Sequence, residues 1–221
     1  MTHRCPETPP LPIAVEPMVD ESWRSYLGRV AREHSCRIEE IGARLGLWHK
    51  GRWLPTCRVT LTVDHAQHAA RTLNLTIEQV IRMYPSRWDG LALQVGALTH
   101  TRPNLWPNLP TAWTYTATPR ACPNCRAENP SYTSLLWHLP WITHCARHGA
   151  ALTDHSTADP PIKDSGRGRT NDLIGLLDSH QVAPFAGAEV PAPLALRAWL
   201  ECAALLAATN NHRHWPRPPT I

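Results

Sequence analysis

The chain has 221 residues, which can hold one large domain or two small ones, and 43% of them are hydrophobic, enough for a core. A net charge of +4 does not by itself indicate a nucleic-acid partner. The sequence has no run of about eighteen apolar residues and no signal-peptide pattern, so we expect a cytoplasmic protein with no membrane segment. Seven cysteines, an odd number, fit a reducing compartment better than a disulfide scaffold.

Apolar spacing predicts a first pair of helices after a proline-rich, extended segment over residues 1–19. Asp20 is the expected N-cap of the first helix. Apolar side chains then recur every three or four residues over positions 23–34, as on one face of a helix. A second helix follows over residues 38–45, and Gly46 is expected to end it.

A second helix pair is predicted after a loop over residues 48–62, in which residues 59–61 suit a short extended piece. Helical spacing returns over residues 63–73. Thr76-Ile-Glu-Gln79 is then a capping-box signature for another helix, which ends before Pro85.

The two predicted pairs resemble each other at a constant offset of 39 residues. Ala31-Arg32 matches Ala70-Arg71, and Ile38-Glu39 matches Ile77-Glu78. This similarity is either an internal repeat or a chance match. In both cases we expect two helix–short turn–helix units whose apolar faces pack together.

Two short motifs carry the strongest chemical signal. A Cys-x-x-Cys and a Cys-x-x-His are separated by nineteen residues, so the intervening chain can fold back and bring both halves to one point. Three thiolates and an imidazole are a common set for one structural zinc ion and leave no open position for catalysis; the candidate ligands are Cys122, Cys125, Cys145 and His148. The alternatives are two unrelated pairs, a redox Cys-x-x-Cys, or a ligand exchange in which His144 replaces Cys145 or His148.

The segment between the two motifs, residues 131–143, suits short strands or a strand and a turn, because Pro140 interrupts any longer helix. A polar linker follows over residues 153–169, and helical spacing returns near residues 171–179 and 194–208. The expected fold is therefore mainly α, and α+β overall.

We divide the chain into three parts. Residues 1–98 form a helical region of the helix-turn-helix type, and residues 99–157 form the zinc-binding module. Residues 158–221 hold the linker, the C-terminal helices and a polar tail.

Signatures of catalysis are missing from the sequence. It contains no phosphate-binding glycine loop, no Gly-x-Ser-x-Gly elbow and no dinucleotide fingerprint. Acidic residues come mostly singly, and the adjacent Glu39 and Glu40 point in different directions on a helix. We therefore expect a protein that is not an enzyme.

Basic residues concentrate in the first helix pair and its loop. Residues 24–58 hold eight Lys and Arg against three acids, whereas residues 59–90 hold three of each. Phosphate attraction is therefore expected on the first pair, and the candidate nucleic-acid-binding residues are Arg37, Arg44, Lys50, Arg52 and Arg58. The alternative is a solvated face in a chain whose basic residues are nearly all Arg. Trp48 and Trp53 either stack on bases or anchor a core.

Several motifs, in this order, resemble the TniQ family over residues 11–152. They are Leu11-Pro-Ile13, Pro17, Asp20-Glu-Ser-Trp23, Ser25-Tyr-Leu27, Arg29-Val-Ala31, the helix from Ile41 to Leu47, Cys122-Pro-Asn-Cys125, Trp137-His-Leu139 and Cys145-Ala-Arg-His148-Gly149. The sequence departs from the family pattern at Thr153-Asp-His-Ser156, where many members have a further Cys-Pro-x-Cys, so a second zinc module is not expected.

The resemblance implies a helix-turn-helix region joined to a zinc-ribbon-like β module, with the four ligands named above holding the metal. It implies a non-catalytic target-selection adaptor of transposons related to the Tn-seven group. Such adaptors bridge DNA, or a targeting complex that can be RNA-guided, to an AAA+ ATPase that recruits the transposase. The alternatives are a zinc-containing helix-turn-helix transcription regulator and, from another class, a zinc-dependent nuclease or phage-defence component.

Overall fold

The structure, a computed structural model, describes residues 8–90, 119–153, 167–185 and 188–208. The chain divides into two compact units. Unit 1 comprises Met1–Arg87 together with Asn129–Leu135, and unit 2 comprises Trp88–Glu128 together with Leu136–Ile221. The three-part division at residues 98 and 157 stays a prediction.

The fold is mainly helical with two small antiparallel sheets, which confirms the expected class. Within the described ranges, none of the helices combines the length and the apolar character needed to cross a bilayer. The expected irregular segment before residue 119, most of the linker and the polar tail lie outside the described residues.

The first helix pair of unit 1 consists of α1 (Trp23–Glu33) and α2 (Ile38–Arg44). The N-cap of α1 is Ser22 and not Asp20, because the Ser22 hydroxyl accepts the amide N–H of Ser25 at 3.4 Å. Asp20 has a positive φ of 52°, and its carbonyl instead accepts the amide of Leu135 at 2.7 Å. The expected cap was wrong because a distant segment fixes the backbone at Asp20.

The second pair consists of α3 (Val63–Leu73) and α4 (Ile77–Arg82). The predicted capping box is present, since Thr76 accepts from the Gln79 amide at 3.1 Å and donates its own amide to the Gln79 side chain at 2.8 Å.

The backbone confirms that the two pairs correspond at an offset of 39. Ser35 and Asn74 both take left-handed φ values, 49° and 57°, at the turns after α1 and α3. The next amide in each turn then donates to an equivalent carbonyl at 2.9 Å, Cys36 to Ala31 and Leu75 to Ala70.

A short hairpin follows α2, where the sequence suggested a loop. Its strands are β1 (Trp48–His49) and β2 (Arg52–Trp53), paired antiparallel. Lys50 and Gly51 between them have φ values of 50° and 77°, as a two-residue type I′ turn requires. A 3₁₀ turn, η1 (Pro55–Arg58), comes next, and residues 59–61 form no strand.

The core of unit 1 joins both helix pairs and the N-terminal segment. Trp23 lies against Tyr26 and Tyr84, with ring centroids 5.9 Å and 5.3 Å away. The other buried apolar residues of this cluster are Leu11, Val15, Leu27, Val30, Ala31, Ile41, Leu45, Leu47, Cys57, Ala66, Ala69, Ala70, Leu73, Val80 and Met83. The α3 and α4 helices are followed by the 3₁₀ turn η2 (Pro85–Trp88).

Residues 129–135 complete unit 1 although they lie between the two cysteine motifs in sequence. Glu21 and Ser134 form an isolated antiparallel bridge, and the Ser22 amide donates to the Thr133 carbonyl at 2.9 Å. The side chain of Glu21 is fully buried here and pairs with Arg29 at 2.6 Å.

Unit 2 contains α6 (Pro123–Glu128), α7 (Arg167–Leu177) and α8 (Ala192–Ala208). The 3₁₀ turn η5 (Leu135–His138) stands where short strands were expected. The hairpin of β3 (Val182–Phe185) and β4 (Ala188–Pro191) joins α7 to α8 and had no sequence prediction. Each strand contains a proline, and because proline is unfavourable inside a strand, the sequence pattern did not predict either of them.

Candidate metal centre and basic surface

The first half of the candidate metal centre is built at the start of α6. Cys122 directly precedes the helix, and the amide of Arg126 donates to its carbonyl at 3.1 Å. Ala121 and Thr153 exchange two backbone hydrogen bonds of 2.9 Å, which close the base of the segment. Cys125, one turn into the helix, therefore points to the same side as Cys122.

The second half is a tight turn that ends on a glycine. The Gly149 amide donates to the Cys145 carbonyl at 2.7 Å, and Gly149 has a φ of 64°, which favours glycine. The Cys145 amide donates to the Ala150 carbonyl at 2.8 Å. The turn brings Cys145 and His148 to one side of the chain.

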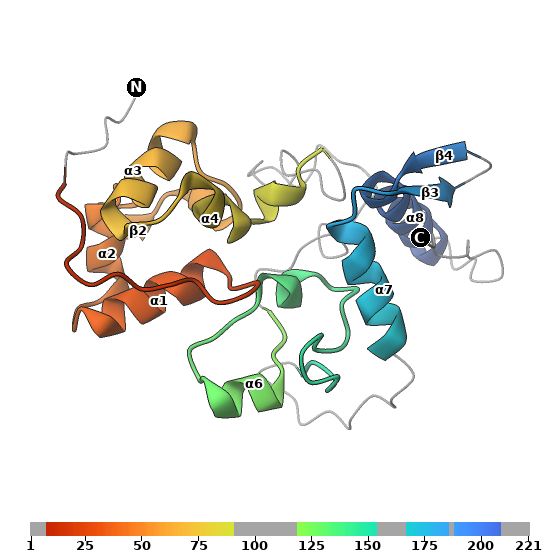
Figure 1. Cartoon of the computed structure of the whole chain (residues 1–221), viewed down its shortest axis with the longest axis horizontal. Helices are drawn as coiled ribbons and strands as arrows, with labels where there is room; N and C mark the ends of the chain where they lie inside the picture. The colour runs from red at the N-terminus through yellow and green to blue at the C-terminus, as the bar shows by residue number, and fades with distance from the viewer. Residues whose placement is uncertain (1–7, 91–118, 154–166, 186–187, 209–221) are drawn as a thin grey trace. The chain divides into compact units, whose positions relative to one another are not determined.

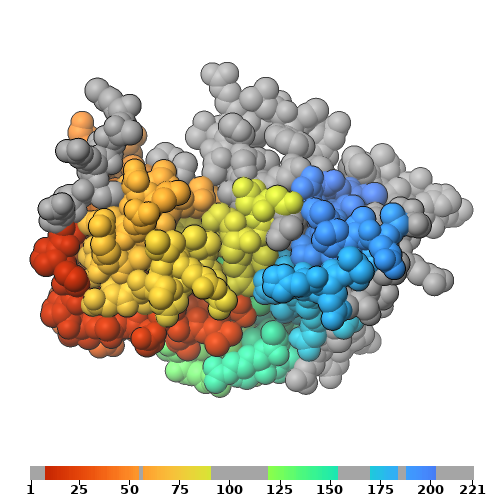
Figure 2. All heavy atoms as spheres, turned by 45° about the horizontal axis from the view of Figure 1, so that its top comes forward, coloured from red at the N-terminus to blue at the C-terminus, as the bar shows by residue number. Residues whose placement is uncertain are grey.

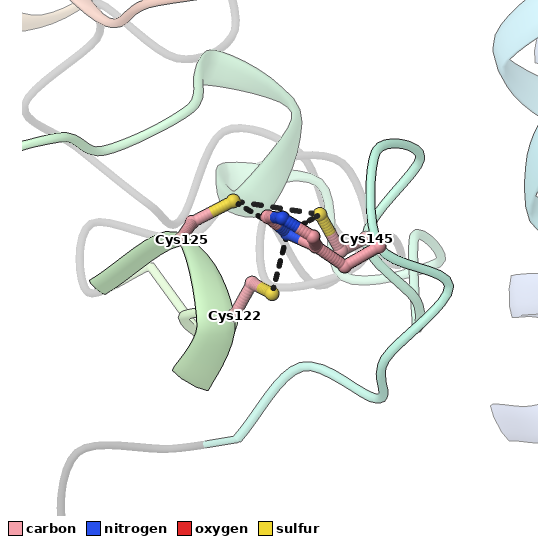
Figure 3. A group of neighbouring side chains, drawn as sticks. Cys122, Cys125 and Cys145 are labelled. Atoms are coloured by element: carbon pink, nitrogen blue, oxygen red, sulfur yellow. Dashed lines mark hydrogen bonds between the residues drawn. The ribbon is translucent and has the colours of Figure 1, made fainter. Parts of the chain in front are cut away.

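The structure brings all four predicted ligands together, with their ligand atoms within 4.8 Å of one another. Figure 3 shows the sulfur atoms of Cys122, Cys125 and Cys145 converging. The Sγ atoms of Cys125 and Cys145 are 3.7 Å apart, and Nδ1 of His148 lies 3.6, 3.2 and 3.8 Å from the Sγ atoms of Cys122, Cys125 and Cys145. A tetrahedron with metal–sulfur bonds of about 2.3 Å has edges of roughly 3.8 Å. The donor set therefore fits one tetrahedral metal ion.

The electrostatics of the cluster also suit a cation. Burial, followed by hydrogen bonding and charge interaction with Cys145, raises the pKa of the Cys125 thiol. Burial likewise raises the pKa of Cys122. Neighbouring thiolates in a buried site repel one another, and a bound metal ion offsets that repulsion.

His144 does not belong to this group. It is buried, its Nδ1 lies 2.9 Å from the Thr143 hydroxyl, and the four-residue cluster excludes it. The ligand exchange considered from the sequence is therefore not seen, and neither is a pairing in which the two motifs are unrelated.

The five candidate nucleic-acid-binding residues fall into two groups. Arg37 pairs with Glu40 at 3.3 Å, and the half-buried Arg44 donates to the Pro9 carbonyl at 2.8 Å. Lys50, Arg52 and Arg58 are exposed, and within the described ranges no acid pairs with any of them.

The hairpin that carries Lys50 and Arg52 is held by indole packing. A Cβ placed on Gly42 would lie 2.6 Å from the Trp53 ring, so the indole sits directly on α2. Trp48 meets Trp53 edge to face at 5.6 Å, and the Arg24 guanidinium lies 5.9 Å from the Trp53 ring. Both indoles are half-buried, so their contacts are those of packing residues.

An apolar groove on the second helix pair was missed from the sequence. It is lined by Thr60, Leu61, Val63, Ala66, Ile77, Val80, Ile81, Tyr84 and Ser86. Val63, Ile77 and Ile81 are large exposed apolar residues, at 72%, 43% and 42%. Figure 2 shows part of the second helix pair, in orange and yellow, at the surface.

The correspondence between the two helix pairs relates this groove to a covered surface in the first pair. Val63 and Ile81 lie 39 positions after Arg24 and Gly42, the residues that Trp53 covers in the first pair. In the second pair the equivalent surface is an open groove, and no indole from the described residues lines or fills it. The comparison of the two pairs could have indicated this from sequence, since Gly42 corresponds to the large apolar Ile81.

Comparison with known proteins gives one family. The family model described as TniQ matches residues 12–152, a span that includes α1 to α4 and all four candidate ligands. None of the curated proteins and none of the solved structures matches the chain.

Proposed function

This chain belongs to the TniQ family, and we propose that it is a non-catalytic adaptor that binds target DNA or a targeting complex and docks on an AAA+ transposition regulator. Membership in the family implies a transposition-associated adaptor role. The observation that carries the proposal is the family match over residues 12–152. The action on DNA is expected in the cytoplasm.

The proposed DNA surface is the β1–β2 hairpin with the end of η1. Lys50, Arg52 and Arg58 are exposed there and carry charge that no acid among the described residues pairs with. When exposed, unpaired cations of this kind bind DNA phosphates, they displace the counterions condensed on the DNA. Arg37 and Arg44 already have protein partners, so we expect weaker contributions from them.

Replacing Lys50, Arg52 and Arg58 together by alanine should weaken DNA binding and flatten its salt dependence. The slope of log affinity against log salt should fall by roughly 0.9 for each phosphate that the variant no longer neutralises. Fluorescence anisotropy over a salt series measures this slope. Arg71→Ala, which removes an exposed cation from α3, is the control. If the triple variant shows the same slope as the wild-type protein, these three residues do not contact DNA phosphates and the proposed DNA surface is wrong.

The proposed docking site for the ATPase is the apolar groove lined by Val63, Ile77 and Ile81. Exposed apolar patches of this kind are typical of protein-binding surfaces. In the first helix pair an indole covers the equivalent positions, so we expect the regulator to supply an aromatic side chain.

Ile77→Ser with Ile81→Ser should abolish capture of the chain by its cognate ATPase on DNA, while DNA binding by the chain alone stays within about twofold of wild type, because surface substitutions rarely disturb a fold. A pull-down with purified proteins measures capture. Val19→Ser, at a residue 84% exposed, is the matched control. Failure of the folded wild-type chain to associate with the ATPase would contradict the adaptor proposal, and operator binding without any ATPase would favour the transcription regulator.

We further propose zinc as the metal of the Cys122–His148 cluster. Three thiolates and one imidazole in a tetrahedral arrangement suit zinc, and four protein ligands leave no position for a substrate. The ion would hold the two half-sites together and would support folding of the segment. Elemental analysis that returned no stoichiometric metal would contradict this assignment.

A further inference from the structure

The metal cluster has a carboxylate on its outer side that the metal ligands do not include. Nε2 of His148 lies 3.0 Å from Oε1 of Glu128, and the other carboxylate oxygen of Glu128 lies 3.0 Å from a guanidinium nitrogen of Arg147. Glu128 is the last residue of α6, the helix that carries Cys125, whereas Arg147 and His148 belong to the other half-site. The carboxylate therefore joins the two halves outside the ligand shell.

The chemistry of imidazole explains how the contact between His148 and Glu128 can affect metal binding. Nδ1 of His148 is the nitrogen that faces the three sulfur atoms, at 3.2–3.8 Å. A histidine that binds metal through Nδ1 must carry its proton on Nε2, and that N–H then needs an acceptor. A carboxylate in this position holds the ring orientation and makes the ligand nitrogen more basic.

We propose that Glu128 is a positioning residue for the metal centre: its carboxylate accepts a hydrogen bond from the Nε2–H of His148 and so aims Nδ1 at the metal. The inference rests on the proposed metal binding by this cluster. Helix stability does not account for a glutamate at position 128, because an acid is unfavourable at the C-terminal end of a helix. Arg147 only steadies the carboxylate, since that ion pair is 64% and 48% exposed and exposed pairs are weak.

The test compares metal affinity in the full chain. Glu128→Ala removes the acceptor, Glu128→Gln keeps an amide oxygen in its place, and Arg147→Ala is the control that takes away the neighbouring charge. Each protein is stripped of metal under reducing conditions and titrated with zinc in competition with a chromogenic chelator. The rate of zinc release to excess chelator is measured as well.

We expect Glu128→Ala to weaken zinc binding about tenfold and to speed zinc release, because loss of a hydrogen-bond partner of a ligand histidine costs about 10–100-fold in affinity and this partner is half-exposed. Glu128→Gln should recover most of the affinity, and Arg147→Ala should stay within about twofold. A residue that only supported the fold would lower the melting temperature of the zinc-saturated protein without this graded order in release rate.

The outcomes separate the two proposals. Wild-type affinity and release rate in Glu128→Ala, in a chain that does bind zinc, would overturn the role of Glu128 alone. A wild-type chain that takes up no zinc would overturn the proposed metal centre, and this inference with it. A nitrogen-15 spectrum of the zinc-loaded protein with the proton of His148 on Nδ1 would also contradict the inference.

Discussion

Cys125→Ser should release the proposed zinc ion and unfold residues 119–128 and 136–153, while α1 to α4 stay folded. This part of unit 2 has little regular structure of its own, since it contains one short helix, one 3₁₀ turn and isolated bridges. A structural zinc ion contributes on the order of 10 kcal/mol to the folding of such modules. In the proposed zinc site, loss of one of the four ligands should therefore remove the main source of stability of this segment.

Hydrogen exchange before and after the substitution measures this effect residue by residue. Amides such as Cys145, which donates to Ala150, and Leu152, which donates to Thr143, should lose their protection. Amides of Thr133 and Leu135 should keep theirs, because they donate to Ser25 and Asp20 within unit 1.

Cys202→Ser is the matched control, because Cys202 is an exposed cysteine outside the ligand set. It should keep both the metal and the exchange pattern. Loss of protection throughout α1 to α4 in Cys125→Ser would show that unit 1 does not fold independently of the metal.

Elements whose signals are local were predictable from the sequence. The bounds of α3 and the capping box of α4 depend on residues within a few positions of each other, and both agree with the structure. The cluster of four candidate metal ligands was also predictable from spacing alone, since each half-site is a four-residue motif whose geometry the backbone determines locally.

Features that depend on distant chain segments were not predictable. Asp20 was expected to cap α1, and the hydrogen bond from Leu135, more than 100 residues later, could not be inferred from the pattern. Glu128 gave no signal for the same reason, because its partner His148 lies on the other half-site. The strands of the β1–β2 hairpin have two residues each, too few to show alternation.

The motif Glu21, Ser25 and Arg29 illustrates the limit most clearly, because the sequence gives only three polar residues spaced four positions apart, before and within the first helix. In the structure they form one buried network. Both carboxylate oxygens of Glu21 accept from Arg29, at 2.9 and 2.6 Å, and the Ser25 hydroxyl donates to Glu21 at 2.8 Å. The same hydroxyl accepts the Thr133 amide at 2.9 Å, which ties residues 129–135 to α1.

Glu21→Ala should destabilise unit 1 by about 3–5 kcal/mol, because removing one partner of a buried ion pair leaves the other charge uncompensated. The side chain of Glu21 is 0% exposed and that of Arg29 is 16% exposed, so water cannot replace the lost carboxylate. The hydrogen bond to Glu21 raises the pKa of the Arg29 guanidinium, which therefore stays charged. Against a typical total stability of about 5–15 kcal/mol, this loss is large.

Urea unfolding followed by circular dichroism measures the difference, with Glu78→Ala as the control. Glu78 pairs with Arg82 at 2.7 Å, but the two side chains are 73% and 70% exposed, so we expect a change below about 1 kcal/mol. Glu21→Gln should lie between the two, since it keeps an acceptor and loses the charge. Equal effects of Glu21→Ala and Glu78→Ala would mean that the buried network does not hold unit 1 together. If instead Glu21→Ala unfolds unit 1, any loss of the proposed DNA binding in that variant follows from unfolding. Only the substitutions at Lys50, Arg52 and Arg58 then test the proposed DNA surface.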